Sequence, residues 1–212
     1  MVVLVTMIKK LLFATGNSFK FNLMKKRLER FKDIELVNPK MLGIKIDVEE
    51  DGLTAEENSI KKAKAYYEAT KLPTIAEDAG LYIDKFKEAE QPGLFVKRVN
   101  GKDNLSDREI LNYYIDKLRG YNGRSFAHYF TGVAIVDKDG NIHSDTINET
   151  EFLLTAKQCK KVSVKGGILE SISFDLDAEK YFDERTPEEE EFHYKDLNNQ
   201  YCNLVEEYVL KN

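Results

Sequence analysis

The chain carries a short polar stretch, Thr15–Lys20, whose residue types suit the binding of a polyphosphate. The stretch lies between an apolar run and a helical pattern, which predicts a turn from a strand into a helix. Such a turn points free backbone N–H groups and the positive end of the helix dipole at one spot. Gly16 lets the backbone come close to a ligand, Asn17 can donate two hydrogen bonds, and Lys20 adds a positive charge. Taken alone, the same residues also fit an ordinary turn with an exposed lysine.

Two acidic stretches, Glu49–Gly52 and Glu77–Gly80, supply carboxylates. The second follows a short apolar run and predicts a sharp turn at the end of a strand, where ligands collect in open α/β sheets. Either stretch alone also fits a solvated surface loop. Mg²⁺ takes one or two carboxylates, with waters and substrate phosphates in its other positions. Together with Lys20, the two stretches form the minimum set for metal-assisted attack on a nucleotide phosphorus.

The hydrophobic periods alternate between those of strands and those of helices, which indicates an α/β protein. Lys10–Ala14 predicts a buried strand, and the helix after it presents Met24, Leu28 and Phe31 on one face and Arg27 on the other. The other predicted strands are Glu35–Val37, Thr74–Ala76, Leu81–Asp84, Ser125–Val136 and Ile142–Leu154. The other predicted helices run from Thr54 to Thr70, from Ser106, and through Leu197, Tyr201, Leu204 and Tyr208.

The composition and charge limit which classes of protein are possible. The net charge is −5 and no basic face is evident, so no nucleic-acid partner is predicted. Cys159 and Cys202 lack Cys-x-x-Cys spacing, which argues against a zinc site and a disulfide framework and favours a reducing cytoplasm. Residues 1–7 are apolar but too short to span a bilayer, so no membrane partner is predicted. The length of 212 residues fits one domain or two closely joined lobes, with residues 1–6 interpreted as a dispensable extension.

Four blocks of sequence resemble the inosine triphosphate pyrophosphatase family, whose members remove deaminated purine nucleotides. Four blocks in the same order are more specific than any one of them. The blocks are Leu11–Asn17 with Lys20, Glu49–Thr54 with Glu57, Asn58, Lys62 and Ala63, Ile75–Leu81 with Asp84, and Pro92 and Gly93 with Arg98.

The resemblance implies a role for each matched position. Asp78 binds the metal ion, Mg²⁺, and accepts a proton from the attacking water. Glu49 is the second metal ligand, with Glu50 as the alternative. Ala79 lies near the substrate, where many members have serine or threonine, and Arg98 is assigned to the substrate as well. The residues that grip the triphosphate are Thr15, Gly16, Asn17 and Lys20.

The C-terminal half departs from the family pattern. Phe174 and Asp175 are the best counterpart of a block whose aromatic residue stacks on the purine, although Phe174 also fits the core. His193 and Lys195 stand near the usual Ser-His-Arg segment, and a buried structural role is the alternative for His193. Glu190 occupies the position of a lysine of the family. Leu23 likewise replaces a glutamate on the first helix.

The resemblance implies an α/β fold with an elongated, twisted mixed sheet flanked by helices, and two lobes with a central cleft. The expected reaction is Mg²⁺-dependent hydrolysis of a nucleoside triphosphate, such as ITP, XTP or dITP, to the monophosphate and pyrophosphate. A cytoplasmic homodimer is expected from the family. Two alternatives remain: the same chemistry on a different nucleotide, and a nucleotide-binding protein with little catalysis.

Overall fold

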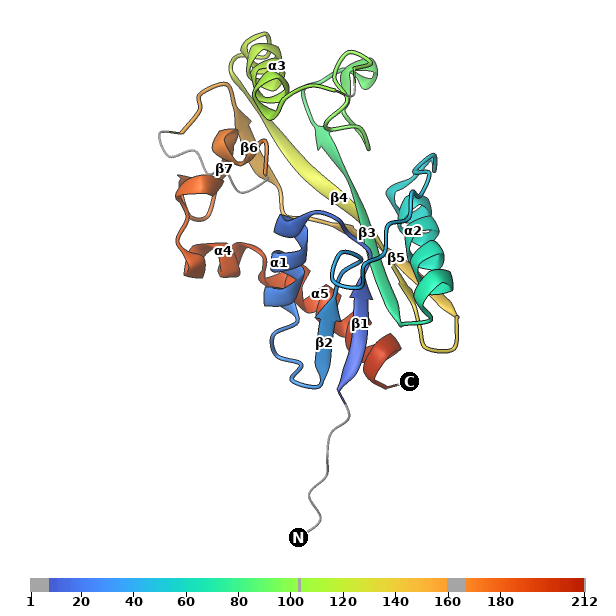
Figure 1. The fold of residues 1–212 in the computed structure, drawn as a ribbon. Helices are drawn as coiled ribbons and strands as arrows, with labels where there is room; N and C mark the ends of the chain where they lie inside the picture. Colours follow the sequence, from blue (N-terminus) through green and yellow to red (C-terminus); the bar gives the residue numbers. More distant parts are fainter. Residues whose placement is uncertain (1–7, 103, 160–166, 212) are drawn as a thin grey trace. The chain divides into compact units, whose positions relative to one another are not determined.

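The computed structural model describes residues 8–102, 104–159 and 167–211, so the extension predicted at residues 1–6 lies outside the described residues. The strands of this part of the chain form one mixed sheet in the order β2-β1-β3-β4-β6-β7-β8, and β5 pairs with β4. Helices separate the strands in the first part of the chain and flank a mixed sheet, which confirms the predicted α/β class (Figure 1).

The chain divides into two compact units. Unit 1 contains the described residues up to Asp78, together with Gly132–Ile147 and the residues from Asn198 onward. Unit 2 contains Ala79–Thr131 and the described residues of Asn148–Leu197. The division agrees with the prediction of two lobes.

Unit 1 begins with a β-α-β arrangement around a buried strand. β1 (Lys9–Phe13) pairs in parallel with β2 (Ile34–Val37) on one side and with β3 (Thr74–Ile83) on the other. A strand buried on both faces reads as a continuous apolar run, which is why the sequence predicts it well. α1 (Ser18–Arg27) connects β1 to β2 and ends earlier than the predicted apolar face, because Phe31 already lies in a turn closed by its N–H to the carbonyl of Leu28.

β3 corrects one prediction. The sequence predicts two strands separated by a sharp turn at Glu77–Gly80, but Thr74–Ile83 is one continuous strand. Gly80 serves close packing rather than a turn, since a Cβ there would lie 2.1 Å from the ring of Phe130. Adjacent residues of a strand point to opposite faces of the sheet, so the Glu77 and Asp78 side chains point in opposite directions.

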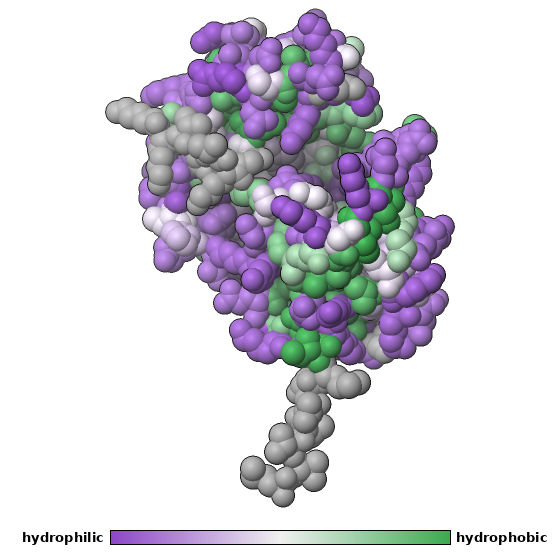
Figure 2. Space-filling view, in the orientation of Figure 1, coloured by the Kyte–Doolittle hydropathy of each residue, from purple (hydrophilic) through white to green (hydrophobic). Residues whose placement is uncertain are grey.

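α2 (Ala55–Thr70) packs on the unit 1 part of the sheet. Thr54 caps its start by accepting a hydrogen bond from the N–H of Glu57, as the sequence predicts. Gly132 allows the close approach of this helix, because a Cβ there would lie 2.2 Å from the backbone N of Glu56. Figure 2 shows hydrophobic surface over this part of unit 1. The partly buried apolar residues packed against its core are Leu42, Ile44, Ile46, Val48, Ile60, Tyr67 and Leu72.

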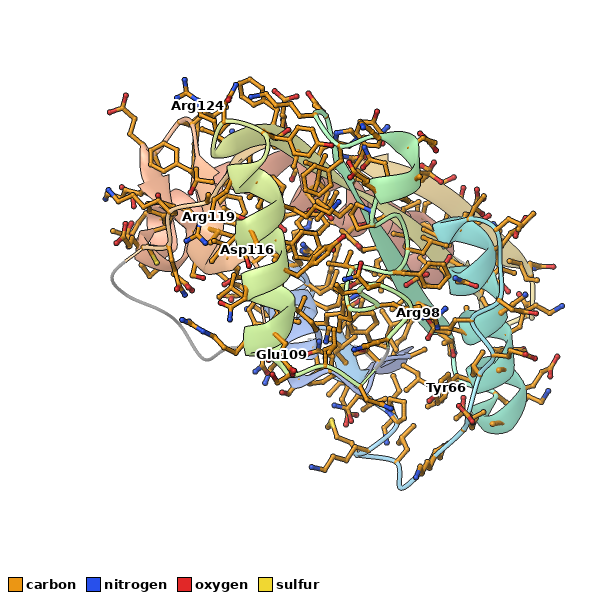
Figure 3. The ribbon with its side chains drawn as sticks, turned by 90° about the horizontal axis from the view of Figure 1, so that it is seen from above. Tyr66, Arg98, Glu109, Asp116, Arg119 and Arg124 are labelled. Carbon is orange, nitrogen blue, oxygen red and sulfur yellow. The ribbon has the colours of Figure 1, made fainter. Side chains whose placement is uncertain are left out.

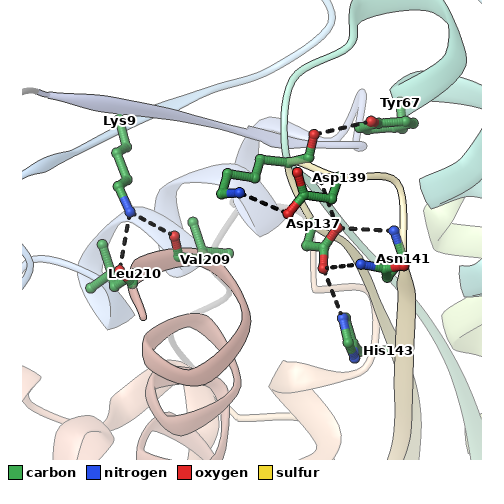
Figure 4. A network of polar contacts seen from close by, with 9 residues as sticks. Lys9, Tyr67, Asp137, Asp139, Asn141, His143, Val209 and Leu210 are labelled. Atoms are coloured by element: carbon green, nitrogen blue, oxygen red, sulfur yellow. Dashed lines mark hydrogen bonds and ion pairs between the residues drawn. The ribbon is translucent and has the colours of Figure 1, made fainter. Parts of the chain in front are cut away.

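A hairpin turn at Asp139 and Gly140 joins β4 (Arg124–Val136) to β5 (Ile142–Asn148). Asp137 is buried beneath it and accepts hydrogen bonds from the backbone and side chain of Asn141, with His143 Nε2 3.2 Å away (Figure 4). The return strand is shorter than predicted: β5 stops at Asn148, and β6 (Phe152–Thr155) is a separate strand antiparallel to β4.

Unit 2 has its own core beneath α3 (Asp107–Arg119). The helix begins after Ser106, as predicted, with a capping box formed by Ser106 and Glu109, and its apolar face is buried. The outer face carries exposed charges, and Asp116 and Arg119 pair there at 2.6 Å (Figure 3). The sheet continues through β7 (Ser173–Asp175) and β8 (Lys180–Tyr181). Single 3-10 turns occur at η1 (Glu88–Glu90), η2 (Glu170–Ile172) and η3 (Phe182–Glu184).

The chain ends in two helices and a wider turn. α4 (Pro187–His193) starts at the cap Thr186, and α5 (Lys195–Val205) continues into a π-helical turn, η4 (Glu206–Leu210). Lys9 Nζ lies 3.1 Å from the carbonyl oxygens of Val209 and Leu210, so β1 holds the last turn in place (Figure 4). Of the helices in the described residues, none is both long and apolar enough to cross a membrane.

Candidate active site

The predicted phosphate turn is present at the carboxyl end of β1. The Ala14 N–H bonds to the carbonyl of Ile75, so the turn begins where the pairing of β1 with β3 ends. Asn17 is the N-cap of α1: its Oδ1 accepts hydrogen bonds from the N–H groups of Phe19 at 2.9 Å and Lys20 at 3.4 Å. The side-chain oxygen of Asn17 is thus occupied by N–H groups of the first helical turn. Its side-chain NH₂ group is left as the donor for a ligand.

Gly16 lies at the exposed tip of this turn. Its φ is not in the left-handed region, and a Cβ built on it would have no protein atom within 4 Å. No acceptor in the described part of the chain takes its backbone N–H. The fold itself therefore does not require a glycine here, whereas close approach of a ligand to the backbone would require one.

Lys20 lies on the first turn of α1 and reaches β3. Its Nζ is 3.3 Å from Oε1 of Glu77, whose other oxygen accepts a hydrogen bond from the Tyr201 hydroxyl at 2.6 Å. Arg27 approaches the same carboxylate at 3.9 Å. Burial alone would raise the pKa of Glu77, but the charges of Lys20 and Arg27, together with hydrogen bonds from Tyr201 and Lys20, hold it below its usual value. Arg27 was expected on the opposite face of α1 from the core, yet its side chain is only 6% exposed, which corrects that prediction.

Asp78 is held on the other face of β3 by a chain of hydrogen bonds. Its Oδ2 accepts from Nδ2 of the buried Asn58 at 3.0 Å, and Asn58 Oδ1 accepts from the Gly52 N–H at 2.7 Å. A Cβ on Gly52 would lie 2.6 Å from Asn58 Oδ1, so a glycine is required here. These hydrogen bonds link the predicted acidic stretch 49–52 to β3 through Asn58 of α2.

Lys62 joins the two predicted acidic stretches. Its Nζ lies 3.4 Å from Glu50 and 3.6 Å from Asp78, and its side chain is 12% exposed. Glu49 lies exposed in the same segment. Among the residues that the structure describes, no group of three or more His, Cys, Asp or Glu side chains could hold a metal ion. Glu50 and Asp78 therefore offer two carboxylates on either side of one lysine, and Mg²⁺ needs only one or two carboxylates where waters and phosphates supply its other ligands.

The remaining predicted substrate residues lie in unit 2. Ala79 follows Asp78 in β3 and is half-buried. Arg98 is exposed, and its guanidinium lies over the ring of Phe95 at 4.4 Å. Phe174 is half-buried with its ring edge-on to Tyr181, and Lys195 is exposed at the start of α5. Their contacts with a nucleotide stay predictions.

Asp175 and His193 form part of a buried network. Asp175 Oδ2 lies 3.0 Å from both Arg185 Nη1 and His193 Nδ1, and its Oδ1 accepts from the backbone N–H of Ala178. Burial would raise the pKa of Asp175, but these partners hold it below its usual value. Burial, together with the Arg185 charge, lowers the pKa of His193. The arrangement fits the structural alternative for His193, and its contact with a nucleotide stays a prediction.

Sequence reasoning assigned no role to several residues of these sites. Asn58 and Lys62 are four residues apart on one face of α2, a spacing that could have revealed their shared contact with Asp78. Tyr201 was predicted only as part of an apolar face, and its hydroxyl contact with Glu77 left no signal in the sequence. Arg185 stood in an acidic stretch and gave no sign of its burial.

The fold and the unit 1 site define an α/β protein with a glycine-containing strand-to-helix turn beside acidic side chains. The chain belongs to the Ham1 family, whose sequence model matches residues 11–156. This result, together with the names of the relatives below, confirms the resemblance seen in the sequence.

Several known proteins are similar to this chain. The dITP/XTP pyrophosphatase of Leptospira biflexa serovar Patoc is 35% identical over 134 residues, which cover 63% of this chain and 65% of that protein. The dITP/XTP pyrophosphatase of Borrelia recurrentis is 34% identical over 142 residues, which cover 64% and 67%. A dITP/XTP pyrophosphatase of Leptospira interrogans is covered over 51% of its length. The chain therefore spans about half to two thirds of the length of these curated relatives.

Solved structures share the fold. The Staphylococcus aureus Ham1 protein has a TM-score of 0.72 at 22% identity, and the match covers 93% of this chain and 98% of that one. A HAM1 protein from Coxiella burnetii has a TM-score of 0.71 at 22% identity, and the match covers 92% and 99%. At this identity the likeness shows the fold alone.

Proposed function

We propose that this protein hydrolyses a nucleoside triphosphate to the monophosphate and pyrophosphate, with a deaminated purine nucleotide such as ITP, XTP or dITP as substrate. The proposal is carried by two polar clusters within unit 1: the Gly16 turn with Lys20 beside Glu77, and, on the other face of β3, the carboxylates of Glu50 and Asp78 around Lys62. The names of the relatives, dITP/XTP pyrophosphatase, support the same reaction.

Mg²⁺ is the cofactor that these residues fit. Glu50 and Asp78 already attract one positive group, the Nζ of Lys62, at 3.4 and 3.6 Å. Asp78 with Glu49 or Glu50 would hold the ion, since Mg²⁺ needs only one or two carboxylates when phosphates supply further ligands. When bound, the ion neutralises phosphate charge and lowers the pKa of a water.

The residues of the chain then have distinct tasks. Asp78 Oδ2 accepts a hydrogen bond from Asn58, whereas Oδ1 lies 3.6 Å from Lys62 Nζ, beyond hydrogen-bond distance. Oδ1 is therefore the atom assigned to accept a proton from the attacking water as a general base. Lys20 and the backbone N–H of Gly16 stabilise the negative charge that develops on the leaving pyrophosphate. Thr15 and the NH₂ group of Asn17 complete the grip on the phosphates.

The remaining residues named by the resemblance are proposed to contact the nucleoside. The residues proposed for these contacts are Ala79, Arg98, Phe174, Asp175, His193 and Lys195. The resemblance further implies a cytoplasmic homodimer, which belongs to the same proposal.

Product analysis tests the reaction directly. Purified protein is mixed with ITP and Mg²⁺, and nucleotide, pyrophosphate and phosphate are quantified over time. The proposal expects monophosphate and pyrophosphate in equal amounts and no activity when the metal is chelated. Release of inorganic phosphate in place of pyrophosphate, or no turnover with Mg²⁺, would contradict it.

A second candidate keeps the chemistry and changes the base. The pairing of Asp175 with both Arg185 and His193 in a buried cluster favours it, because side chains paired with one another are less available to read a 6-oxopurine. The same assay with ATP, GTP, CTP, UTP and dTTP decides between the two candidates. Preference for ITP and XTP supports the first, and preference for another nucleotide supports the second.

A further inference from the structure

The buried carboxylate of Glu77 in unit 1 has two positively charged neighbours, although one would balance its single negative charge. The Glu77 side chain is 10% exposed and lies 3.3 Å from Lys20 Nζ and 3.9 Å from Arg27 Nη1. The Tyr201 hydroxyl donates a third contact at 2.6 Å. A single carboxylate thus has two cations and one neutral donor.

The two cations differ in their freedom to move. The Arg27 side chain is 6% exposed, its guanidinium lies 4.5 Å from the centre of the Tyr201 ring, and its Nε donates to Asn198 Oδ1 at 3.0 Å. Arg27 is therefore fixed inside unit 1 and cannot touch a nucleotide. The Lys20 side chain is 34% exposed and stands on the phosphate turn.

A phosphate at the turn competes with Glu77 for Lys20. If Lys20 were the only partner of Glu77, its movement to the phosphate would leave a buried carboxylate with no cation, which is strongly unfavourable. Arg27 and Tyr201 remain at Glu77 when Lys20 leaves. We propose that Arg27 and Tyr201 are positioning residues, which keep the Glu77 charge satisfied so that Lys20 can move to the substrate phosphates. The inference rests on the proposed function and deepens it.

Binding of inorganic tripolyphosphate, measured by titration calorimetry without metal, tests the inference separately from hydrolysis. We expect Arg27→Met to raise the Kd at least about tenfold, because Lys20 is then needed at Glu77. Arg27→Lys keeps a cation and retains most of the affinity. In the activity assay, Arg27→Met raises the KM and leaves kcat within about threefold, since Arg27 does not touch the reacting atoms.

Arg30→Met is the matched control. Arg30 follows the same helix, but its side chain is 47% exposed and it pairs with the equally exposed Glu206 at 4.0 Å. Removal of this arginine leaves the tripolyphosphate Kd unchanged. An equal loss of affinity in Arg30→Met and Arg27→Met would show a general effect of net charge and overturn the inference.

Double variants separate positioning from simple support of the fold. Glu77→Gln combined with Arg27→Met restores the affinity, because no buried charge then requires a cation. In a Lys20→Met background, Arg27→Met causes no further loss, because it acts only through Lys20. If Arg27→Met lowered the tripolyphosphate affinity equally in the wild type and in Lys20→Met, the inference would be contradicted.

Tyr201→Phe gives a second, milder test that keeps the aromatic ring beneath Arg27. It removes one hydrogen-bond donor to Glu77. We expect the Kd for tripolyphosphate to rise by about threefold when Lys20 is present, and to stay unchanged in the Lys20→Met background. If Arg27→Met does not fold, this pair of measurements carries the test. A protein that binds tripolyphosphate but does not hydrolyse ITP contradicts the proposed function alone, whereas unchanged binding by Arg27→Met contradicts the inference alone.

Discussion

Two clusters of charged residues, the phosphate turn with its acidic stretch in unit 1 and the Asp175 network in unit 2, differ in how much of their side chains reaches solvent. In unit 1, Lys20, Lys62 and Glu50 keep 34%, 12% and 47% of their side chains exposed around the phosphate turn and the acidic stretch. In unit 2, Arg185 and Asp175 are 4% and 2% exposed and pair with each other. Charges that reach solvent are available to a ligand, whereas charges that satisfy one another hold a fold together.

This difference predicts two patterns of response to substitution. Changes at the unit 1 site should reduce activity more than stability, and changes in the buried unit 2 network should reduce stability more than activity. The family model matches residues 11–156, which include the whole turn and both acidic stretches but not Asp175 and Arg185. Four substitutions test the division, from the largest expected effect to the smallest.

Arg185→Met should destabilise the protein most. Arg185 pairs with Asp175 at 3.0 Å and lies 3.8 Å from the centre of the Phe182 ring, so its loss leaves a buried carboxylate without its arginine. We expect the free energy of unfolding in urea to fall by about 3–5 kcal/mol. The control Arg119→Met, which breaks an exposed pair with Asp116, should cost less than about 1 kcal/mol. Similar values for the two variants would contradict the contrast between the units.

Lys20→Met should have the converse effect. Loss of its charge at the turn should lower kcat/KM for ITP by about 10²–10³-fold, the effect of removing one group that stabilises developing negative charge. Stability should change little, because Glu77 keeps Arg27 and Tyr201. A loss of stability as large as that of Arg185→Met, with kcat/KM preserved, would place Lys20 among the structural residues.

Glu170→Gln tests the pH dependence of unit 2. Burial, then the charge of Asp183, raises the pKa of Glu170 from 4.5 to about 7. The folded state therefore binds a proton that the unfolded state releases between these values, so the contribution of Glu170 to stability is present below pH 4.5 and is lost as the pH rises through 7. We expect the stability of the wild type relative to Glu170→Gln to fall by about 2–3 kcal/mol across this window. Urea unfolding at several pH values measures this. If the free energies of unfolding of wild type and Glu170→Gln differed by the same amount at every pH, the prediction would be contradicted.

Gly16→Ala should show the smallest effect. A methyl group fits the free protein, because no atom lies within 4 Å, but it occupies the path of a phosphate. We expect an increase in KM of about tenfold, worth about 1.4 kcal/mol, with unchanged stability. Gly52→Ala is the opposite case, because its Cβ would lie 2.6 Å from Asn58 Oδ1 and should lower stability. An unchanged KM in Gly16→Ala would remove the argument for close approach of a ligand.

The sequence predicted most of unit 1 because its signals are local. A continuous apolar run gave β1, a change to helical period gave α1, and Thr54 marked the start of α2. The error at β3 came from reading Gly80 as a turn residue, when its role is to make room for Phe130, a residue far away in the sequence. Such packing reasons are not visible in one strand taken alone.

The buried charges could not be predicted for the same reason. A charged residue on a helix is usually exposed, so Arg27 was placed away from the core, and only Tyr201 and Glu77 from distant parts of the chain make its burial favourable. Asp175 was expected from the resemblance, but its partner Arg185 was not. Long-range pairing of this kind has no periodic signature.

The most direct test of the central claim is pyrophosphate release from ITP with Mg²⁺ by the wild type and by Asp78→Asn. Asparagine has nearly the same shape and can still accept the hydrogen bond from Asn58 Nδ2, but it cannot take a proton from water. The account predicts that kcat falls by about 10²–10⁴-fold while tripolyphosphate binding is retained. Equal turnover by the two proteins would contradict the role of Asp78 and, with it, the proposed reaction at this site.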